Sequence, residues 1–250
     1  MSTETYSYSR LNVFDRCKFG YYLQYVEKIK VKYTPDPSTN FGLLLHHLAE
    51  HDIYDYDVAI ELARTKYKPI SDDDLKINLR PCIQNIQEYI AKLNAEFPNH
   101  IRESKLNVPG PMFSLTAKVD RICYGGSSKL KVIDYKTNTS EQSKLSKQLK
   151  LYNGMAIVWL ANNNIVRGVT DIVCELFYVR LNKIKPYVFT RDAIVTYFTE
   201  LVDTVKMIES TEIWSPSPSE FTCKFCNFKD DPVLCSHSYY NRSKFYRKFK

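Results

Sequence analysis

Two stretches in the middle of the chain alternate apolar and polar residues, as half-buried β-strands do. They cover residues 113–120 and 130–136, and the sequence Gly-Gly-Ser-Ser at 125–128 between them is typical of a tight turn. Residues 169–181 and 185–190 have the composition of two further strands. We therefore predict a β-hairpin near the centre of the chain, followed by more strands.

Elsewhere, apolar residues recur at spacings of three and four, which predicts amphipathic helices. The expected helices are one from Arg10 capped by Ser9, one from about Phe41, a helical insertion at about 52–100 that ends at Pro98, one at about 141–160, and one that starts at Thr190 or Asp192. Residues 33–40 and 215–219 are rich in proline and serine. We predict a loop for the first of these segments and an extended linker for the second.

The composition indicates a folded, basic protein. The chain has 250 residues, of which 44% are hydrophobic, so a packed core is expected rather than disorder. Its formal charge of +7 favours a polyanionic partner. No apolar run of membrane-spanning length is present, and Met1–Tyr6 lacks the features of a secretory signal. We therefore expect no membrane association and a cytoplasmic protein of a bacterium, an archaeon or a virus.

The predicted hairpin carries charged side chains on one face. Residues two apart in a strand point the same way, so Asp134 and Lys136 project together, and Asp120 lies on the polar face of the first strand. Two close carboxylates repel each other, and a hard divalent cation removes this conflict because carboxylate oxygens are its preferred ligands. The simpler alternative is a solvated strand face with ordinary charges.

The cysteines indicate a metal or cluster site. Cys223 and Cys226 form a C-x-x-C pair and Cys235 follows closely, a spacing that lets thiolates reach one metal or cluster. Seven cysteines in a reducing compartment are more often free, catalytic or metal-bound than paired in disulfides. The candidates for a fourth ligand are Cys17, His237, Cys82, Cys123 and Cys174. The last three lie in strand or helix patterns and are interpreted as buried packing residues.

Two polar pairs four residues apart share helix faces, namely His46 with Glu50 and Gln148 with Tyr152. Each pair has a purely structural interpretation, because such a histidine often has no ligand and Tyr152 fits a buried stripe. The segment 239–250 contains five basic residues, five aromatic residues and no acid. This composition suits contacts with phosphates and unpaired bases, although a solvated terminus or a protein contact explains it equally well.

Taken together and in this order, these motifs resemble the PD-(D/E)XK nuclease superfamily in its RecB-like branch. The matching segments are Gly42-x-x-x-His46-x-x-x-Glu50, Val119-Asp120-Arg121, Ile133-Asp134-Tyr135-Lys136-Thr137 and Gln148-x-x-x-Tyr152. Val119 stands where the family name has proline, and Cys123 where many members have a second acid. The resemblance implies an α/β fold of the restriction-endonuclease type, with a mixed central sheet flanked by helices.

The resemblance also implies metal-dependent hydrolysis of phosphodiester bonds. The implied ligands of Mg²⁺ or Mn²⁺ are His46, Asp120, Asp134 and the backbone carbonyl of Tyr135. An imidazole among oxygen ligands favours Mn²⁺. Lys136 is expected to position or activate the attacking water, and the residues expected to assist it are Glu50, Gln148 and Tyr152.

The cysteine pattern resembles a subset of these nucleases with an iron–sulfur cluster, including CRISPR-adaptation nucleases and AddB-type helicase–nucleases. In that subset one cysteine precedes the nuclease core and three follow it, which makes Cys17 the expected fourth ligand of a [4Fe–4S] cluster. We thus expect residues 1–40 to form an N-terminal helix and loop with this cysteine, residues 41–212 to form the core, and residues 213–250 to form the linker, the cysteine segment and a basic tail.

The expected function is that of a DNA nuclease, with exonuclease action on single-stranded DNA or DNA ends in recombination, repair or processing. The DNA-binding residues expected in the tail are Arg242, Lys244, Arg247 and Lys248. The chain has no Walker-type motif, so a helicase would be a separate partner. The alternatives are a catalytically silent DNA-binding scaffold and a zinc-stapled nucleic-acid-binding module.

Overall fold

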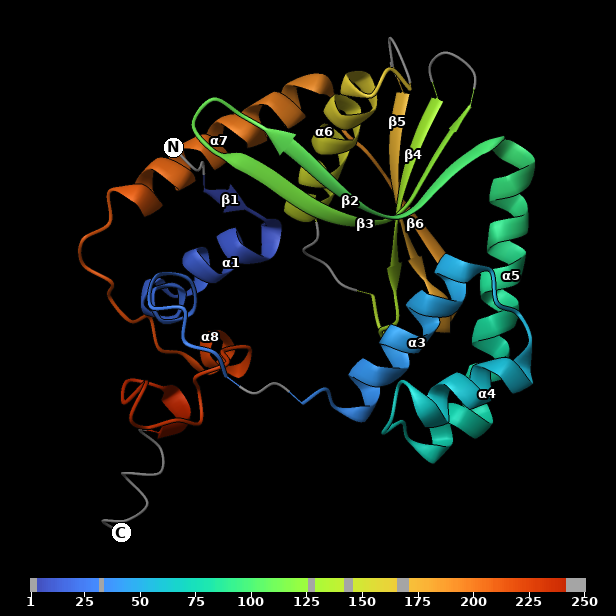
Figure 1. The fold of residues 1–250 in the computed structure, drawn as a ribbon, viewed down its shortest axis with the longest axis horizontal. Coiled ribbons are helices and arrows are strands. Elements are labelled where there is room, and N and C mark those ends of the chain that lie inside the picture. Colours follow the sequence, from blue (N-terminus) through green and yellow to red (C-terminus); the bar gives the residue numbers. More distant parts are fainter. Residues whose placement is uncertain (1–3, 32–33, 126–128, 142–145, 166–170, 242–250) are drawn as a thin grey trace. The chain divides into compact units, whose positions relative to one another are not determined.

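The computed structural model describes most of the chain (Figure 1). The described residues are 4–31, 34–125, 129–141, 146–165 and 171–241. The chain divides into two compact units, each built from two segments. The first unit contains Met1–Thr5 and Pro35–Phe198, and the second contains Tyr6–Thr34 and Thr199–Lys250. Within the described part of the chain, no helix has both the length and the hydrophobicity needed to cross a bilayer.

A six-stranded mixed sheet forms the centre of the first unit. Its strands are β1 (Thr5–Tyr6), β2 (Asn99–Pro109), β3 (Ser114–Gly125), β4 (Lys129–Lys136), β5 (Asp171–Tyr178) and β6 (Lys183–Val188). The order is β1-β3-β4-β5-β6, and β2 pairs with β3. Strands β4 and β5 are parallel, whereas the pairs β2–β3, β3–β4 and β5–β6 are antiparallel. The predicted hairpin and the two later strands are confirmed, while turn residues 126–128 lie outside the described chain.

Strand β2 was not predicted, and its residues 99–100 fall at the end of the expected helical insertion. It pairs with β3 from Asn99 opposite Tyr124 to Pro109 opposite Ser114. Its sequence has charged side chains on both faces, so the alternation that identifies a half-buried strand is absent. The hydrogen bonds to β3 make this segment a strand, and these bonds are visible only in the tertiary structure.

The helices along this part of the chain are α3 (Pro37–His51), α4 (Tyr56–Thr65), α5 (Leu79–Glu96), α6 (Ser146–Asn162) and α7 (Arg191–Glu209), with short helical turns at Asp74–Asn78 and Val179–Leu181. Helices α3 and α6 contact the strands of the sheet, α4 and α5 pack against α3, and α7 spans the boundary between the two units. Helix α3 begins earlier than predicted, because Asp36 caps it by accepting a 2.7 Å hydrogen bond from the Thr39 amide. The expected loop is therefore wrong at 37–40. Thr190 caps α7 by accepting a hydrogen bond from the Ala193 amide.

The main core lies between the sheet and helices α3, α4 and α5. From the sheet, Cys123, Ile133, Tyr135 and Phe177 join the buried side chains of these helices. Figure 1 shows α6 and α5 on opposite sides of β4 and β5, so both faces of these central strands are covered. The cysteines at 82, 123 and 174 are buried, as predicted for packing residues.

The second unit contains the N-terminal helices and the cysteine-rich segment. Its elements are α1 (Tyr8–Arg16), α2 (Lys18–Tyr21), a π-helical turn at Tyr22–Val26, the end of α7 and α8 (Glu220–Lys224). The predicted Ser9 cap is wrong, because Ser7 accepts the capping hydrogen bond from the Arg10 amide at 3.3 Å. The predicted single helix is interrupted at Cys17, whose extended backbone ends α1 and whose sulfur caps α2 by accepting from the Gly20 amide.

Candidate active site and cysteine cluster

The hairpin of β3 and β4 brings together two carboxylates and one ammonium group. Arg121 pairs with Ile133 across the strands and these two side chains share one face of the hairpin. Asp120 and Asp134, each one residue away, therefore both lie on the other face. The Lys136 ammonium lies 2.5 Å from Asp134 Oδ2. This ammonium is the partner of the buried oxygen, which accepts no hydrogen bond from any other described residue.

Helix α3 adds an imidazole to this group. His46 Nδ1 lies 3.2 Å from Asp120 Oδ1. The other oxygen, Asp120 Oδ2, accepts a hydrogen bond of 2.6 Å from the Tyr135 backbone N–H. Both oxygens of Asp120 therefore have partners that fix the carboxylate between the helix and the next strand.

Gly42 explains how α3 approaches the end of β4 so closely. A Cβ atom at this position would lie 2.8 Å from Thr137 Oγ1, a distance that side-chain carbons do not adopt in proteins without displacing a neighbour. Glycine therefore permits the contact. His46 follows one helical turn later, which places its ring beside the carboxylates.

Glu103 on β2 is a member of the site that the sequence did not reveal. One ligand atom each of His46, Glu103 and Asp120 lie within 4.8 Å of one another. The Glu103 side chain is 10% exposed and forms an ion pair with Lys118. Its backbone has a φ of 43°, a left-handed conformation that costs about 1–3 kcal/mol for residues other than glycine. Because β2 was not predicted as a strand, the pairing that brings Glu103 opposite β3 could not be foreseen.

Burial and mutual repulsion shape the charges of the site. Burial raises the pKa of Asp134; Lys136 opposes this effect and Asp120 adds to it, leaving the pKa above its ordinary value. Burial lowers the pKa of His46, but the charge of Asp120 and its hydrogen bond outweigh this effect and raise the pKa overall. The ionised form of Asp134 is therefore disfavoured, and a nearby divalent cation would favour it.

These donors fit a divalent metal ion. A divalent cation removes the repulsion between Asp120 and Asp134, because the two carboxylates lie close together and carboxylate oxygens are its preferred ligands. The backbone N–H of Tyr135 donates a hydrogen bond to Asp120, which places this residue next to the site. The role of its backbone carbonyl as a metal ligand stays a prediction. The set of one imidazole and several carboxylates suits Mg²⁺ and, with nitrogen included, Mn²⁺.

The remaining residues expected to assist catalysis have other close partners. Glu50 Oε2 lies 3.6 Å from His51 Nε2, so its nearest charged neighbour is on its own helix. Gln148 donates a 2.8 Å hydrogen bond from Nε2 to the Tyr152 hydroxyl on α6. Their roles beside the carboxylates stay predictions. The DNA-binding residues expected in the tail, at 242, 244, 247 and 248, lie outside the described chain.

Arg121 braces the helix that carries His46. Its side chain is fully buried and donates 2.8 Å and 3.1 Å hydrogen bonds from Nη2 to the Ala49 carbonyl and to Asp52 Oδ1. Its Nε donates to the Tyr135 hydroxyl at 2.9 Å. A single guanidinium therefore ties the C-terminal turn of α3 to β4, on the face of the hairpin opposite Asp120.

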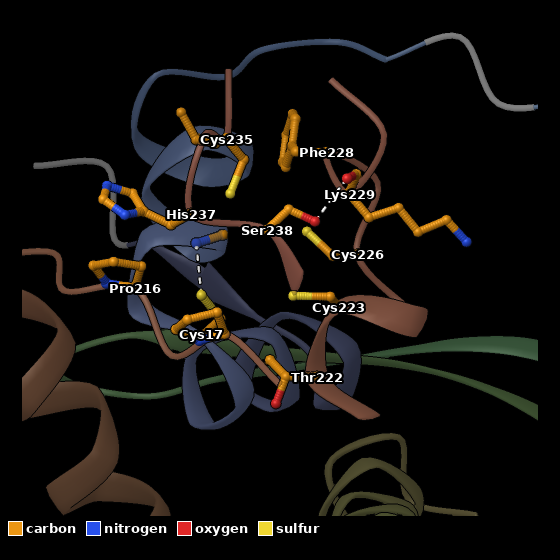
Figure 2. Close-up of a pocket in the computed structure, with 13 residues that line it drawn as sticks. Cys17, Pro216, Thr222, Cys223, Cys226, Phe228, Lys229, Cys235, His237 and Ser238 are labelled. Carbon is orange, nitrogen blue, oxygen red and sulfur yellow. Dashed lines mark hydrogen bonds between the residues drawn. The ribbon is translucent and has the colours of Figure 1, made fainter. Parts of the chain in front are cut away.

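The second unit brings the four cysteines expected as cluster ligands around one pocket. Figure 2 shows the sulfur atoms of Cys17, Cys223, Cys226 and Cys235 facing a shared space. Gly20 lies between two of them, because a Cβ at this position would be 3.8 Å from Cys17 Sγ and 3.9 Å from Cys226 Sγ. Burial is the main cause that raises the pKa of Cys235, and the thiols at 226, 17 and 223 raise it further.

The pocket of the four cysteines also contains one further possible ligand. His237, the alternative fourth ligand, lines the same pocket, and its ring packs edge-on against Phe19 with centroids 6.1 Å apart.

Comparisons with known proteins identify the family and the fold. The family model of the PD-(D/E)XK nuclease superfamily matches residues 5–230. The chain is similar to the crystal structure of a candidate exonuclease from Eubacterium rectale, with 10% identity and a TM-score of 0.52 over 86% of this chain and 84% of that chain. The structure of SSO0001 has 16% identity and a TM-score of 0.31 over 90% and 95% of the two chains. No curated protein sequence matches the chain.

Proposed function

The chain belongs to the PD-(D/E)XK nuclease superfamily, and on this premise we propose that it hydrolyses phosphodiester bonds in DNA with the help of a divalent metal ion. The fold expected from the sequence, a mixed sheet flanked by helices, is confirmed. One observation carries the proposal. His46, Asp120, Asp134 and Lys136 come from three different elements and meet at one point, where two carboxylates lie close enough to repel each other.

In this proposal a bound cation would be held by donors from α3, β3 and β4. The ligands are His46, Asp120, Asp134 and the Tyr135 carbonyl, with Glu103 as a further carboxylate. When bound, the metal lowers the pKa of a coordinated water and neutralises charge on the phosphate. Asp120 keeps its orientation through the Tyr135 N–H, and Arg121 keeps α3 in place behind it.

Lys136 has the position of a group that acts on the substrate or the water. Its ammonium is held beside Asp134 and its side chain is 15% exposed, so part of it faces solvent. An ammonium has three donors and no acceptor, which lets it hold a water and a phosphate oxygen at once. We assign to it the positioning of the attacking water and the stabilisation of charge at the phosphate. Glu50, Gln148 and Tyr152 are proposed to orient water or DNA.

The proposed cleavage mode is exonucleolytic, on single-stranded DNA or DNA ends, in recombination, repair or processing. The comparison with the candidate exonuclease supports the mode, and the formal charge of +7 supports a polyanionic substrate. A separate helicase is the proposed partner for unwinding duplexes. The RecB-like branch is supported by the order of the histidine, aspartate and lysine motifs along the chain.

For the second unit we propose an iron–sulfur cluster with a structural role. The four cysteines come from both segments of the unit, so a cluster would cross-link its N-terminal helices to its C-terminal segment. The resemblance of the cysteine pattern to that of iron–sulfur nucleases favours a cluster over a single zinc ion. The complete set of metal-binding and lysine residues likewise favours a nuclease over a silent scaffold.

Cleavage of end-labelled DNA tests the proposed function. Single-stranded, double-stranded and circular single-stranded substrates are incubated with Mg²⁺ or Mn²⁺; degradation of linear but not circular DNA identifies an exonuclease. Asp134→Ala, Asp120→Ala and Lys136→Ala should each lower the rate at least about 100-fold while DNA is still bound. Asp72→Ala is the matched control, because this acid forms an exposed pair with Lys76. Full activity of Asp134→Ala contradicts the proposal.

A further inference from the structure

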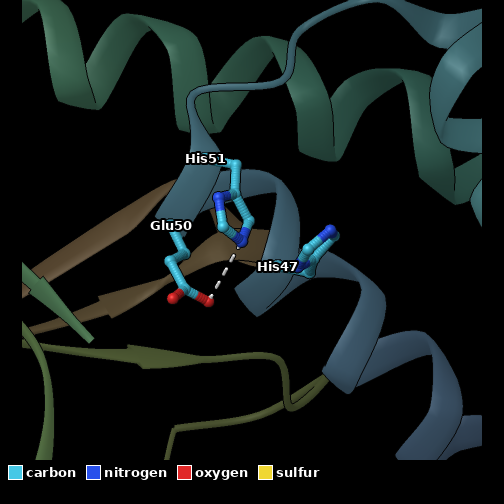
Figure 3. Close-up of side chains that lie close together, drawn as sticks. All are labelled: His47, Glu50 and His51. Atoms are coloured by element: carbon cyan, nitrogen blue, oxygen red, sulfur yellow. Dashed lines mark ion pairs between the residues drawn. The ribbon is translucent and has the colours of Figure 1, made fainter. Parts of the chain in front are cut away.

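A second group of metal-binding side chains lies on the last two turns of α3. His47, Glu50 and His51 each offer a ligand atom, and these atoms lie within 4.8 Å of one another. The rings of His47 and His51 have centroids 4.2 Å apart, and His51 Nε2 is 3.6 Å from Glu50 Oε2 (Figure 3). The helix places His47 next to both Glu50 and His51, which follow it by three and four residues.

We propose that His47, Glu50 and His51 bind a zinc ion at a site distinct from the carboxylate site of the hairpin. Two imidazoles and one carboxylate match the ligands that zinc accepts, and a water can fill the remaining position. Two imidazole nitrogens make the group a poor match for Mg²⁺ or Ca²⁺, which prefer oxygen ligands. The order His-x-x-Glu-His with this helical spacing is also found in zinc-binding helices of other enzymes.

The helix geometry separates this site from the neighbouring histidine. His46 precedes His47 directly, so the two side chains leave α3 in directions about 100° apart. His46 contacts Asp120 on β3, whereas the His47 ring lies tilted against Tyr67, with centroids 5.6 Å apart, and edge-on to His51. The ligands are accessible, since the His51 side chain is 50% exposed and that of Glu50 is 29% exposed. Zinc can therefore enter from solvent without opening the core.

Binding would also clamp the end of α3. The helix ends at His51, and the left-handed Asp52 that follows donates its N–H to the Leu48 carbonyl. A metal ion bound by both His47 and His51 would connect the two ends of the last turn of α3, and this connection would stabilise that turn against unfolding. Zinc would thus stabilise the helix that carries His46, although it binds elsewhere on that helix.

Histidine-specific labelling tests this site on the full chain. Diethylpyrocarbonate modifies unliganded imidazoles, and mass spectrometry reports each histidine separately, so zinc captured by the cysteines does not confuse the result. At zinc concentrations about ten times the dissociation constant, modification of His47 and His51 should slow about tenfold, because the unliganded fraction falls in proportion. His51→Gln should abolish protection of His47, and Glu50→Gln should weaken it.

His46→Ala is the control that separates the two sites. Protection of His47 and His51 should persist in this variant if they form their own site. Loss of protection in His46→Ala, or an unchanged modification rate of His47 in the native chain with zinc, overturns the proposal. The readout is histidine modification rather than DNA cleavage, so its failure leaves the nuclease proposal intact, whereas zinc binding would take Glu50 out of the water-orienting role proposed for it.

Discussion

The replacement Arg121→Met tests whether one buried guanidinium holds the active-site helix against the sheet. Methionine keeps an unbranched apolar chain of similar reach, so the core stays filled. The variant removes the donors to the Ala49 carbonyl and the Tyr135 hydroxyl. It also removes a charge next to Asp52, which keeps its contact with Arg102 at 2.5 Å.

The size of the effect follows from what loses its partner. A buried polar group left without a hydrogen bond costs about 1–3 kcal/mol, and two neutral acceptors are affected here. The guanidinium no longer has to be desolvated, which offsets part of this loss. We expect the first unit to lose about 3 kcal/mol of unfolding free energy, or about 6–12 °C in Tm for a unit of this size. Affinity for Mn²⁺ should fall as well, because α3 carries His46.

Tryptophan fluorescence can report on the first unit alone. The chain has two tryptophans, Trp159 on α6 of the first unit and Trp214 in the second unit. In a Trp214→Phe background, urea unfolding followed by Trp159 therefore measures the unit that contains Arg121. Arg102→Met is the matched control, because this arginine also contacts Asp52 but its side chain is 40% exposed.

The control is expected to cost no more than about 1 kcal/mol, as exposed ion pairs contribute little. If Arg121→Met destabilises the first unit no more than Arg102→Met does, the guanidinium does not hold α3 in place. If Arg121→Met lowers stability but leaves the affinity for Mn²⁺ unchanged, the guanidinium stabilises the first unit but does not position His46.

Three further predictions concern the carboxylate site, the cysteines and the tail. Burial raises the pKa of Asp134 above its usual value of 3.8, so the folded metal-free protein binds this proton more tightly than the unfolded chain does. Urea unfolding in EDTA should therefore show the free energy of unfolding falling as the pH rises from 3.8. The variant Asp134→Asn should lack this pH dependence. Protein purified without oxygen should be brown and contain iron and sulfide, whereas Cys226→Ser should be bleached and less stable, and a colourless protein with stoichiometric zinc would refute the cluster. Removing residues 242–250, which contain five basic residues, should reduce the slope of log K against log salt concentration for single-stranded DNA binding by up to about 3.5. An unchanged slope would show that the tail does not bind DNA.

The sequence by itself determined the central hairpin and the chemistry it carries. Period-two alternation identified β3 and β4, and the same pleat placed Asp134 and Lys136 on one side. These features are local, because the direction of a strand side chain depends only on its position in the pleat. The close spacing of Cys223 and Cys226 likewise indicated a shared site from the chain alone.

Only the tertiary structure decided which distant residues join these local features. Glu103 reaches the site because β2 pairs with β3, and no pattern in its charged sequence predicts that pairing. Arg121 has its role because α3 and β4 supply acceptors far from it in sequence, and a buried charge is stable only with such partners. The sequence gives the periodicity of each element, whereas long-range contacts depend on how the elements pack.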